Sequence, residues 1–484
     1  MKLVRRSQYA CISLLILFGL WSISFVPPIA DDTQLISVGS GMIRTQGIGH
    51  LIREWGQFSL NSSHVTPVGG VITALHIWFV NKLALLDFFS LTQAWGIARV
   101  LWIFTAVIAQ TLFIWAIRGR RMSPPLFALI GVIDLATVQI HGYWSNDPVM
   151  SYPIASWATM TIGFLFLTSL VLGSSGQSRG SRAVFSATAF ALAWCGIFTY
   201  ELFVGFMVAG IPLLPFMRQQ NRRAFSYTLF LISPPLIIFA LLHVLRMSEP
   251  STYSGTEISI ASSSIFRIGV VAILTSFPLA NLRLTSKLLS DWSISYRYAF
   301  RGLISLGVLG LFASVFGISE IRRSENQISN LRLLASMSVL LCVATGIIVV
   351  TPKYQIELHG ELGRVYTNYA AGWLALSTVI VILGVKFYNA NLLSRIILPL
   401  LIVSIGFTQT LANSKQLAAI EANYTWSKVL IDAVDDKSLS NAARCEYLQT
   451  FSSLALPSYY IEAIATGVSN AYQGTNGRAF CSNS

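Results

Sequence analysis

Apolar runs of membrane-spanning length recur along nearly the whole chain, and they constrain its fold more than any other feature. A helix needs about 20 mostly apolar residues to cross the hydrocarbon of a bilayer, and the first run, from about Ala10 to Pro28, approaches that length. Of the 484 residues, 54% are hydrophobic and 11% are charged, against about 25% charged in soluble domains. The sequence therefore predicts an all-α, multi-pass bundle of membrane helices.

Ten more spans are expected after the first, which gives about eleven crossings. They are predicted at 98–117, 124–141, 153–173, 183–199, 202–217, 225–245, 302–319, 331–351, 369–386 and 393–412. Two further apolar segments leave alternatives open. Residues 66–92 fit a re-entrant or surface helix or a close pair of spans, and residues 266–290 fit a tilted span or an interfacial helix.

Basic residues predict which loops face the cytoplasm. Lys and Arg gather in short loops, for example at Arg322 and Arg323, as the positive-inside bias requires. This bias accounts for the net charge of +13 without a nucleic-acid partner. The basic N-terminus is then expected inside, and the loops that alternate with the basic ones are expected outside. The outer segments are 29–65, 142–152, 246–264, 352–368 and the tail 413–484.

The chain is expected to divide into a bundle, 1–412, and a small helical tail, 413–484. Apolar residues recur at helical spacing in this tail, which predicts a helical cap over the outer face. Cys445 and Cys481 both lie in it, and a disulfide between them is expected if the tail is extracytoplasmic. The cap is expected either to shape an acceptor site or to stabilise the last span.

Two adjacent carboxylates, Asp31 and Asp32, come directly after the first span, at the predicted outer surface. Charged groups are costly beside low-dielectric hydrocarbon, so their position favours a chemical role, and a general base is the first hypothesis. The alternative is a solvated turn that only ends the helix.

Most other polar and aromatic residues that could take part in catalysis also fall in the outer segments rather than inside the spans. The candidates are Arg53 and His64 in the first loop, Tyr200 and Glu201 at an outer helix apex, and Lys353 and Arg364 in the loop 352–368. Arg and Lys there can hold a phosphate through charge-assisted hydrogen bonds. This distribution predicts an enzyme that works at the outer membrane surface. The clearest carboxylate inside a span is Asp134, which is expected to pair with Arg99 on the preceding span.

With these residues in view, the chain resembles a known family. The motifs are Asp31-Asp32, Arg53-Glu54-Trp55-Gly56, His64-Val65-Thr66-Pro67, Phe198-Thr199-Tyr200-Glu201 and Thr351-Pro352-Lys353-Tyr354-Gln355. Their order looks like that of the GT-C glycosyltransferases, and within these it is most similar to bacterial enzymes that modify O-antigens of lipopolysaccharide or related cell-envelope glycans. The segment 57–66 departs from the family pattern, because a basic element is expected there and Arg53 or His64 would have to serve instead.

The resemblance implies that one sugar, a hexose, passes with inversion from a polyprenyl-phosphate carrier to an envelope glycan or lipid acceptor. The reaction would take place at the extracytoplasmic face of a bacterial inner membrane. Asp31 or Asp32 would match the acidic residue of the first loop, which acts as general base or positions the acceptor, and Glu201 would match a second acidic position. Lys353 and Arg364 are expected at the donor phosphate from their charge and location.

No cofactor or protein metal site is expected, because the chain has no Walker sequence, HExxH or paired CxxC, although a divalent cation remains open. The expected partners are the lipid-linked sugar, its acceptor and membrane lipid. Two other classes of protein also remain open. One is a multispan transporter or a flippase of a lipid-linked saccharide, and the other is a non-enzymatic assembly protein of an envelope-glycan complex.

Overall fold

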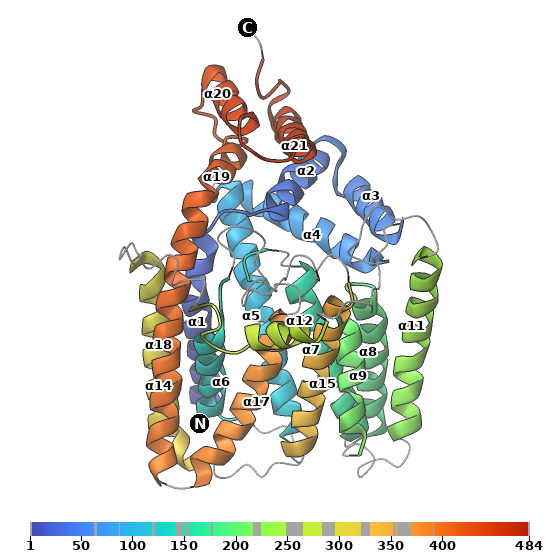
Figure 1. Cartoon of the computed structure of the whole chain (residues 1–484), viewed down its shortest axis with the longest axis vertical. Helices are drawn as coiled ribbons and strands as arrows, with labels where there is room; N and C mark the ends of the chain where they lie inside the picture. Colours follow the sequence, from blue (N-terminus) through green and yellow to red (C-terminus); the bar gives the residue numbers. More distant parts are fainter. Residues whose placement is uncertain are drawn as a thin grey trace.

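The computed structural model describes most of the chain as α-helices packed into one bundle with a helical cap at one end (Figure 1). The described residues are 2–61, 65–86, 88–118, 122–141, 149–151, 154–175, 178–215, 224–247, 265–282, 296–320, 330–351, 355, 369–390 and 392–482. Within these ranges no residue is in a β-strand. We call the end of the bundle that carries the cap the cap end.

The bundle helices match the predicted spans. They are α1 (Lys2–Leu20) with η1 (Trp21–Phe25), α5 (Leu91–Ile117), α6 (Pro124–Thr137), η2 (Ile154–Ala158) with α7 (Thr159–Ser175), α8 (Arg179–Ile197), α9 (Phe203–Ala209) with η3 (Ile211–Leu213), α11 (Ala224–Met247), α14 (Tyr296–Glu320), α15 (Asn330–Val349), α17 (Tyr369–Ala390) and α18 (Leu392–Asn423). In the described part of the chain five stretches are long and apolar enough to cross a membrane: Val4–Phe25, Leu91–Ile117, Ser156–Ser174, Ser226–Leu245 and Leu331–Val349. The prediction of a multi-pass helical membrane protein is confirmed.

Two segments that the sequence left open form helices that lie across the spans (Figure 1). The first, α4 (Pro67–Ala84), is oblique to the bundle at the cap end and exposes apolar side chains, among them Leu75 and Trp78. The second, α12 (Ile265–Thr275), has 11 residues, about half of what a span requires. Both are therefore surface or re-entrant helices rather than complete crossings.

The cap end is built from two parts of the sequence that lie far apart (Figure 1). The first loop contributes α2 (Asp31–Gln46) and α3 (Ile48–Asn61), and the C-terminal segment contributes α19 (Thr425–Asp432), α20 (Asn441–Ser452) and α21 (Ser458–Asn476). A Cβ added at Gly467 of α21 would lie 2.6 Å from a backbone carbon of Ser37 on α2. The absence of a side chain at Gly467 thus lets the two helices approach closely.

The cap is also attached to the bundle. Helix α18 continues without a break from the bundle to Asn423, so a boundary at residue 413 lies inside one helix. The carboxylate of Asp432 accepts hydrogen bonds from the backbone N–H and the hydroxyl of Thr92 in the first turn of α5, at 3.0 and 2.9 Å. A carboxylate at a helix N-terminus is favoured by the helix dipole, so this contact stabilises both elements.

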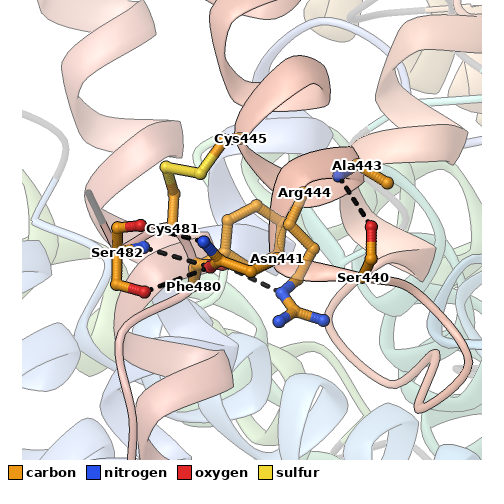
Figure 2. Close-up of a disulfide and its surroundings, with 8 residues drawn as sticks. All are labelled: Ser440, Asn441, Ala443, Arg444, Cys445, Phe480, Cys481 and Ser482. Atoms are coloured by element: carbon orange, nitrogen blue, oxygen red, sulfur yellow. Dashed lines mark hydrogen bonds between the residues drawn. A yellow bond between two sulfur atoms is a disulfide. The ribbon is translucent and has the colours of Figure 1, made fainter. Parts of the chain in front are cut away.

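The C-terminal end of the chain is fixed to α20 by a disulfide between Cys445 and Cys481 (Figure 2). The neighbouring side chain of Arg444 is buried and donates hydrogen bonds to the carbonyl groups of Phe480 and Leu439, at 2.9 and 2.6 Å. Phe480 is itself fully buried in the cap core. The last residues of the described chain are thus part of the packed cap rather than an extended tail.

Candidate functional site

The acidic pair begins a helix at the junction between the bundle and the cap. After η1 the chain is extended through Val26 and two prolines, and α2 starts at Asp31. Proline cannot continue the preceding helix and restricts its neighbours to extended conformations, so the first span ends here. Asp31 and Asp32 then occupy the first turn of α2, where the helix dipole stabilises negative charge.

The residue before the pair, Ala30, is held in a strained conformation, with φ 44° and ψ −128°. A positive φ at a residue with a side chain costs about 1–3 kcal/mol and persists only where the surroundings impose it. Here the carbonyl of Ala30 accepts hydrogen bonds from the backbone N–H of Thr33, at 3.0 Å, and from the phenol of Tyr460 on α21. The cap therefore takes part in fixing the backbone that carries the two carboxylates.

Asp32 is completely buried and faces α5. Burial raises the pKa of its carboxyl well above the ordinary value of 3.8. The positive charge of Arg99 lowers this pKa and the neighbouring charge of Asp31 raises it, and the indole of Trp95 lies close to the carboxyl. Trp95 and Arg99 lie one turn apart on α5 and are both fully buried. Asp32 is thus part of an internal polar unit rather than a solvated helix end.

Arg99 joins this unit to the end of the first span. Its guanidinium donates hydrogen bonds to the carbonyls of Ile23, Val26 and Pro27, at 3.3 to 3.4 Å. These carbonyls belong to the segment where the first helix ends, so their hydrogen bonds cannot all be made within it. Arg99 therefore binds the backbone just before the acidic pair and holds a positive charge close to Asp32.

His76, in the middle of α4, completes the buried neighbourhood on the same face of α5. Its ring packs edge-on against Trp95, with ring centroids 4.7 Å apart. Its Nδ1 accepts a hydrogen bond from the indole N–H of Trp102, at 3.1 Å. A neutral histidine that accepts at Nδ1 carries its proton on Nε2. In the described part of the chain no group accepts a hydrogen bond from this Nε2.

Asp31, the residue before Asp32 on α2, is only partly buried. Two phenols of the cap end are close to it, those of Tyr424 and Tyr460. Burial raises the pKa of both phenols, and the charge of Asp31 raises them further. Of the two adjacent carboxylates, one therefore points into the protein and the other remains accessible between the bundle and the cap.

Two other residues predicted from sequence lie at the start of α4 rather than beside this pair. Tyr200 and Glu201 lie in the turn between α8 and α9, where the carbonyl of Phe198 accepts hydrogen bonds from Val68 and Gly69 at the start of α4, at 3.0 and 3.1 Å. Seven residues of helix, about 10 Å, separate Gly69 from His76. Glu201 thus lies near the far end of α4 from the acidic pair.

Arg53 is exposed on α3, away from the buried unit. His64, Lys353 and Arg364 lie outside the described residues. In the described ranges no group of three or more His, Cys, Asp and Glu side chains is placed to hold a metal ion.

The expected pairing of Asp134 with Arg99 is wrong. Asp134 lies beside the side chains of Gln110 and Ser377, and Gln110 is eleven residues, about 16 Å, further along α5 than Arg99. The carboxylate close to Arg99 is that of Asp32. Sequence reasoning started from the carboxylate of Asp134 inside a span and assigned Arg99 to it, whereas Arg99 lies close to Asp32 of the first loop. It missed His76, Trp95, Tyr424 and Tyr460, for which apolar surroundings left no signal.

Comparison with known proteins gives one distant structural neighbour. No protein-family model matches the chain, and no curated protein matches it. Among solved structures, the chain is similar to the archaeal oligosaccharyltransferase AglB from Archaeoglobus fulgidus in complex with an inhibitory peptide and a dolichol-phosphate. The TM-score is 0.39 and the identity is 11%, over 95% of this chain and 64% of that one. This chain thus spans less than two thirds of the length of that protein.

Proposed function

We propose that this membrane protein is a GT-C-type glycosyltransferase that moves a hexose from a polyprenyl-phosphate carrier to an envelope glycan or lipid acceptor, with inversion. The observation that carries the proposal is the difference in burial between the two adjacent carboxylates. Asp31 is accessible at the junction of bundle and cap, whereas Asp32 is buried against Arg99. A carboxylate at a bundle end, held by strained backbone, suits base catalysis on a substrate that arrives from the membrane.

In the proposed reaction Asp31 is the general base. It removes the proton from an acceptor hydroxyl as the hydroxyl oxygen attacks the anomeric carbon of the sugar. The bond between this carbon and the phosphate oxygen breaks, and the polyprenyl phosphate leaves with the electron pair. Attack opposite to the leaving group inverts the anomeric configuration. The O–H bond of the acceptor and the bond from the anomeric carbon to the phosphate oxygen are thus broken. The glycosidic bond and the O–H bond of protonated Asp31 are formed.

Asp32 is proposed as a positioning residue. Because its carboxyl is completely buried, it is not accessible to an external substrate. Its contacts with Trp95 and the nearby Arg99 instead fix the start of α2, and Arg99 fixes the backbone before it. The orientation of Asp31 then follows from the unit formed by Asp32 and Arg99.

Cationic side chains are proposed to hold the donor phosphate. Lys353 and Arg364 are the first candidates, with Arg53 and His64 as further ones, because Arg and Lys bind phosphate through charge-assisted hydrogen bonds. Tyr200 and Glu201, at the start of α9, are proposed to contact the sugar or the acceptor. The proposal includes no resident cofactor, and chelation with EDTA tests whether a divalent cation assists the leaving phosphate.

The buried amides of the bundle support an enzyme over a transporter. Gln139, Asn281, Gln409 and Asn413 hydrogen-bond to one another and to backbone groups around the end of α6. Such a network braces the interrupted backbone, whereas a transport path keeps its polar groups available to the substrate. A flippase of a lipid-linked saccharide would be favoured instead if the purified protein moved the carrier across a bilayer without cleaving it.

The proposed function is tested with the purified full chain, a radiolabelled polyprenyl-phosphate hexose and a membrane extract as the source of acceptor. Asp31→Asn should lower transfer by at least about 100-fold, the usual contribution of a general base. Asp32→Asn should lower it less, because the amide preserves the shape of a buried carboxyl. Asp436→Asn removes an exposed cap carboxylate and serves as the matched control. Wild-type rates in both Asp31→Asn and Asp32→Asn would refute the proposal.

The proposed extracytoplasmic position of the cap end is tested separately by labelling in intact cells. In a background without Cys11, Cys195 and Cys342, a cysteine placed at Ser438 in the cap should react with an impermeant thiol reagent. A cysteine at Gly180, at the start of α8, should react only after the cells are opened. Reaction at Gly180 from outside would reverse the assigned sides.

A further inference from the structure

Helix α14 presents an apolar stripe that no other part of the described chain covers. Phe300, Ile304, Val308 and Leu311 are spaced so that they share one face, and their side chains are 37–68% exposed. A face of this kind on a bundle of membrane helices is one that contacts lipid. Residues on this face at the two ends of α14 are therefore expected at the boundaries of the bilayer.

Two arginines, Arg297 and Arg301, lie on this lipid-facing stripe in the first turns of α14, at the cap end. They are four residues apart, so their side chains are neighbours on the helix surface. Both guanidinium groups lie over the ring of Phe25, with distances from the guanidinium carbon to the ring centre of 4.1 and 4.6 Å. Phe25 is the last residue of the first span, so the two charges are held at the boundary of that span.

The two cations share at most one carboxylate in the described part of the chain. Arg297 is 3.5 Å from the carboxylate of Glu421, which also accepts a hydrogen bond from the hydroxyl of Tyr298. Arg301 makes no ion pair or hydrogen bond there, and its contacts are with the rings of Phe18 and Phe25. A guanidinium on a lipid-facing surface retains five N–H donors, and losing their hydration without an anion is costly.

A small pocket lies behind the first turns of α14, between the end of the first span, the end of α6, α14 and α18. Its walls include Leu20 and Ile23 of the first span. They also include Tyr298 and Gly302, which directly follow the two arginines in the sequence. Leu417 of α18 also lines it. A mainly apolar recess near two cations at the membrane boundary suits a lipid with an anionic head group. Its acyl chain can enter the recess while the head group remains at the surface.

We propose that Arg297 and Arg301 form a binding site for the phosphate of an anionic phospholipid, with part of its acyl chain in the adjoining pocket. The planar guanidinium groups supply charge-assisted, bidentate hydrogen bonds to phosphate oxygens. Stacking on Phe25 orients both groups before the lipid arrives, which lowers the cost of ordering them. The proposal is independent of sugar transfer, since the two arginines lie on the lipid-facing side of α14 and the site shares no residue with the acidic pair.

The test is native mass spectrometry of the purified full chain in detergent, titrated with phosphatidylglycerol. The double variant Arg297→Ala/Arg301→Ala should weaken phosphatidylglycerol binding by at least about tenfold, because it removes two charge-assisted contacts. Arg297→Lys/Arg301→Lys keeps the charge but not the bidentate geometry, so it should weaken binding by a smaller factor. Arg267→Ala, which removes an exposed arginine of α12, is the matched control and should bind as the wild type does.

Two further arms separate the possible ligands. Phosphatidylcholine, whose head carries no net charge, should bind the wild type several-fold more weakly than phosphatidylglycerol. Inorganic phosphate at 100-fold excess should not displace the lipid, since it cannot use the pocket. If the alanine variant does not fold, the lysine variant alone decides. Unchanged phosphatidylglycerol binding in a folded variant, equal binding of phosphatidylcholine, or displacement by inorganic phosphate would each overturn the proposal.

Discussion

Arg44 of α2 binds Asp435 of the cap through two parallel hydrogen bonds, with N–O distances of 2.6 and 2.9 Å. The same guanidinium also donates to Asn81 on α4 and to Thr475 on α21, both at 3.0 Å. One side chain thus links four parts of the cap end. Only 8% of the Arg44 side chain and 26% of the Asp435 side chain are exposed, so solvent screens this pair less than an ordinary surface ion pair.

The first prediction is that Arg44→Ala loosens the cap. The substitution leaves Asp435 and Asn81 without their shared partner, at an expected cost of about 1–3 kcal/mol. Limited proteolysis should then cut the cap helices several-fold faster than in the wild type. Lys437→Ala, which removes an exposed cation two residues from Asp435, should leave the digestion rate unchanged. Equal rates in both variants would show that the bidentate pair does not hold the cap.

The second prediction concerns the dependence of stability on pH. The pKa of Asp32 is raised in the folded state, so the folded protein binds more protons than the unfolded chain above the ordinary carboxyl pKa of about 3.9. The contribution of Asp32 to stability is therefore lost as the pH rises from this value toward the raised pKa. Asp32→Asn stays neutral, so thermal unfolding of this variant should depend less on pH than unfolding of the wild type. An identical dependence in the two proteins would mean that Asp32 ionises normally.

The third prediction concerns the hydrogen bond from Trp102 to His76. His76→Phe should destabilise the protein by about 1–2 kcal/mol, because the indole N–H loses its acceptor in partly buried surroundings. Adding Trp102→Phe removes the donor as well, so the double variant should cost less than the sum of the two single variants. Thermal unfolding of the four proteins in one detergent gives the coupling energy. Strictly additive costs would indicate that the two side chains do not interact.

The fourth prediction concerns the disulfide of the cap. Cys445→Ser/Cys481→Ser opens a loop with a sequence separation of 36, for which the chain-entropy estimate is a loss of about 3–4 kcal/mol. Amide exchange should accelerate in α20 and in the residues around Phe480, and much less in α5. Cys342→Ser, at a free cysteine of α15, is the matched control. No change in exchange at the cap would show that its core is stable without the disulfide.

The sequence predicts the spans well because each one is a local signal. An apolar run of about 20 residues has few alternatives to a membrane helix, and the described helices follow the predicted intervals. The orientation of α4 and α12 could not be predicted, because their apolar residues suit both a core and a membrane surface. Length settles α12, with its 11 residues, but only the structure shows how α4 lies over α5.

The candidate site could be predicted only in part. Two adjacent carboxylates after the first span are visible in the sequence, but nothing local distinguishes Asp31 from Asp32. Their different surroundings come from distant segments, since Arg99 is on α5 and Tyr460 is about 430 residues further along the chain. The complete burial of the one carboxylate and the partial burial of the other are consequences of packing between these segments. Hydrophobic periodicity does not encode such contacts.

We propose Asp31 as the base of the transfer reaction, and chemical rescue of Asp31→Ala examines that role. The substitution opens space for a small carboxylate beside the accessible face of α2, so added formate can take over proton removal. The measurement is the rate of hexose transfer from the polyprenyl-phosphate donor, with and without formate. We expect formate to raise the rate of Asp31→Ala at least several-fold and to leave the wild type and Asp32→Ala unchanged. A wild-type rate in Asp31→Ala without formate, or rescue of Asp32→Ala alone, would contradict this role of Asp31.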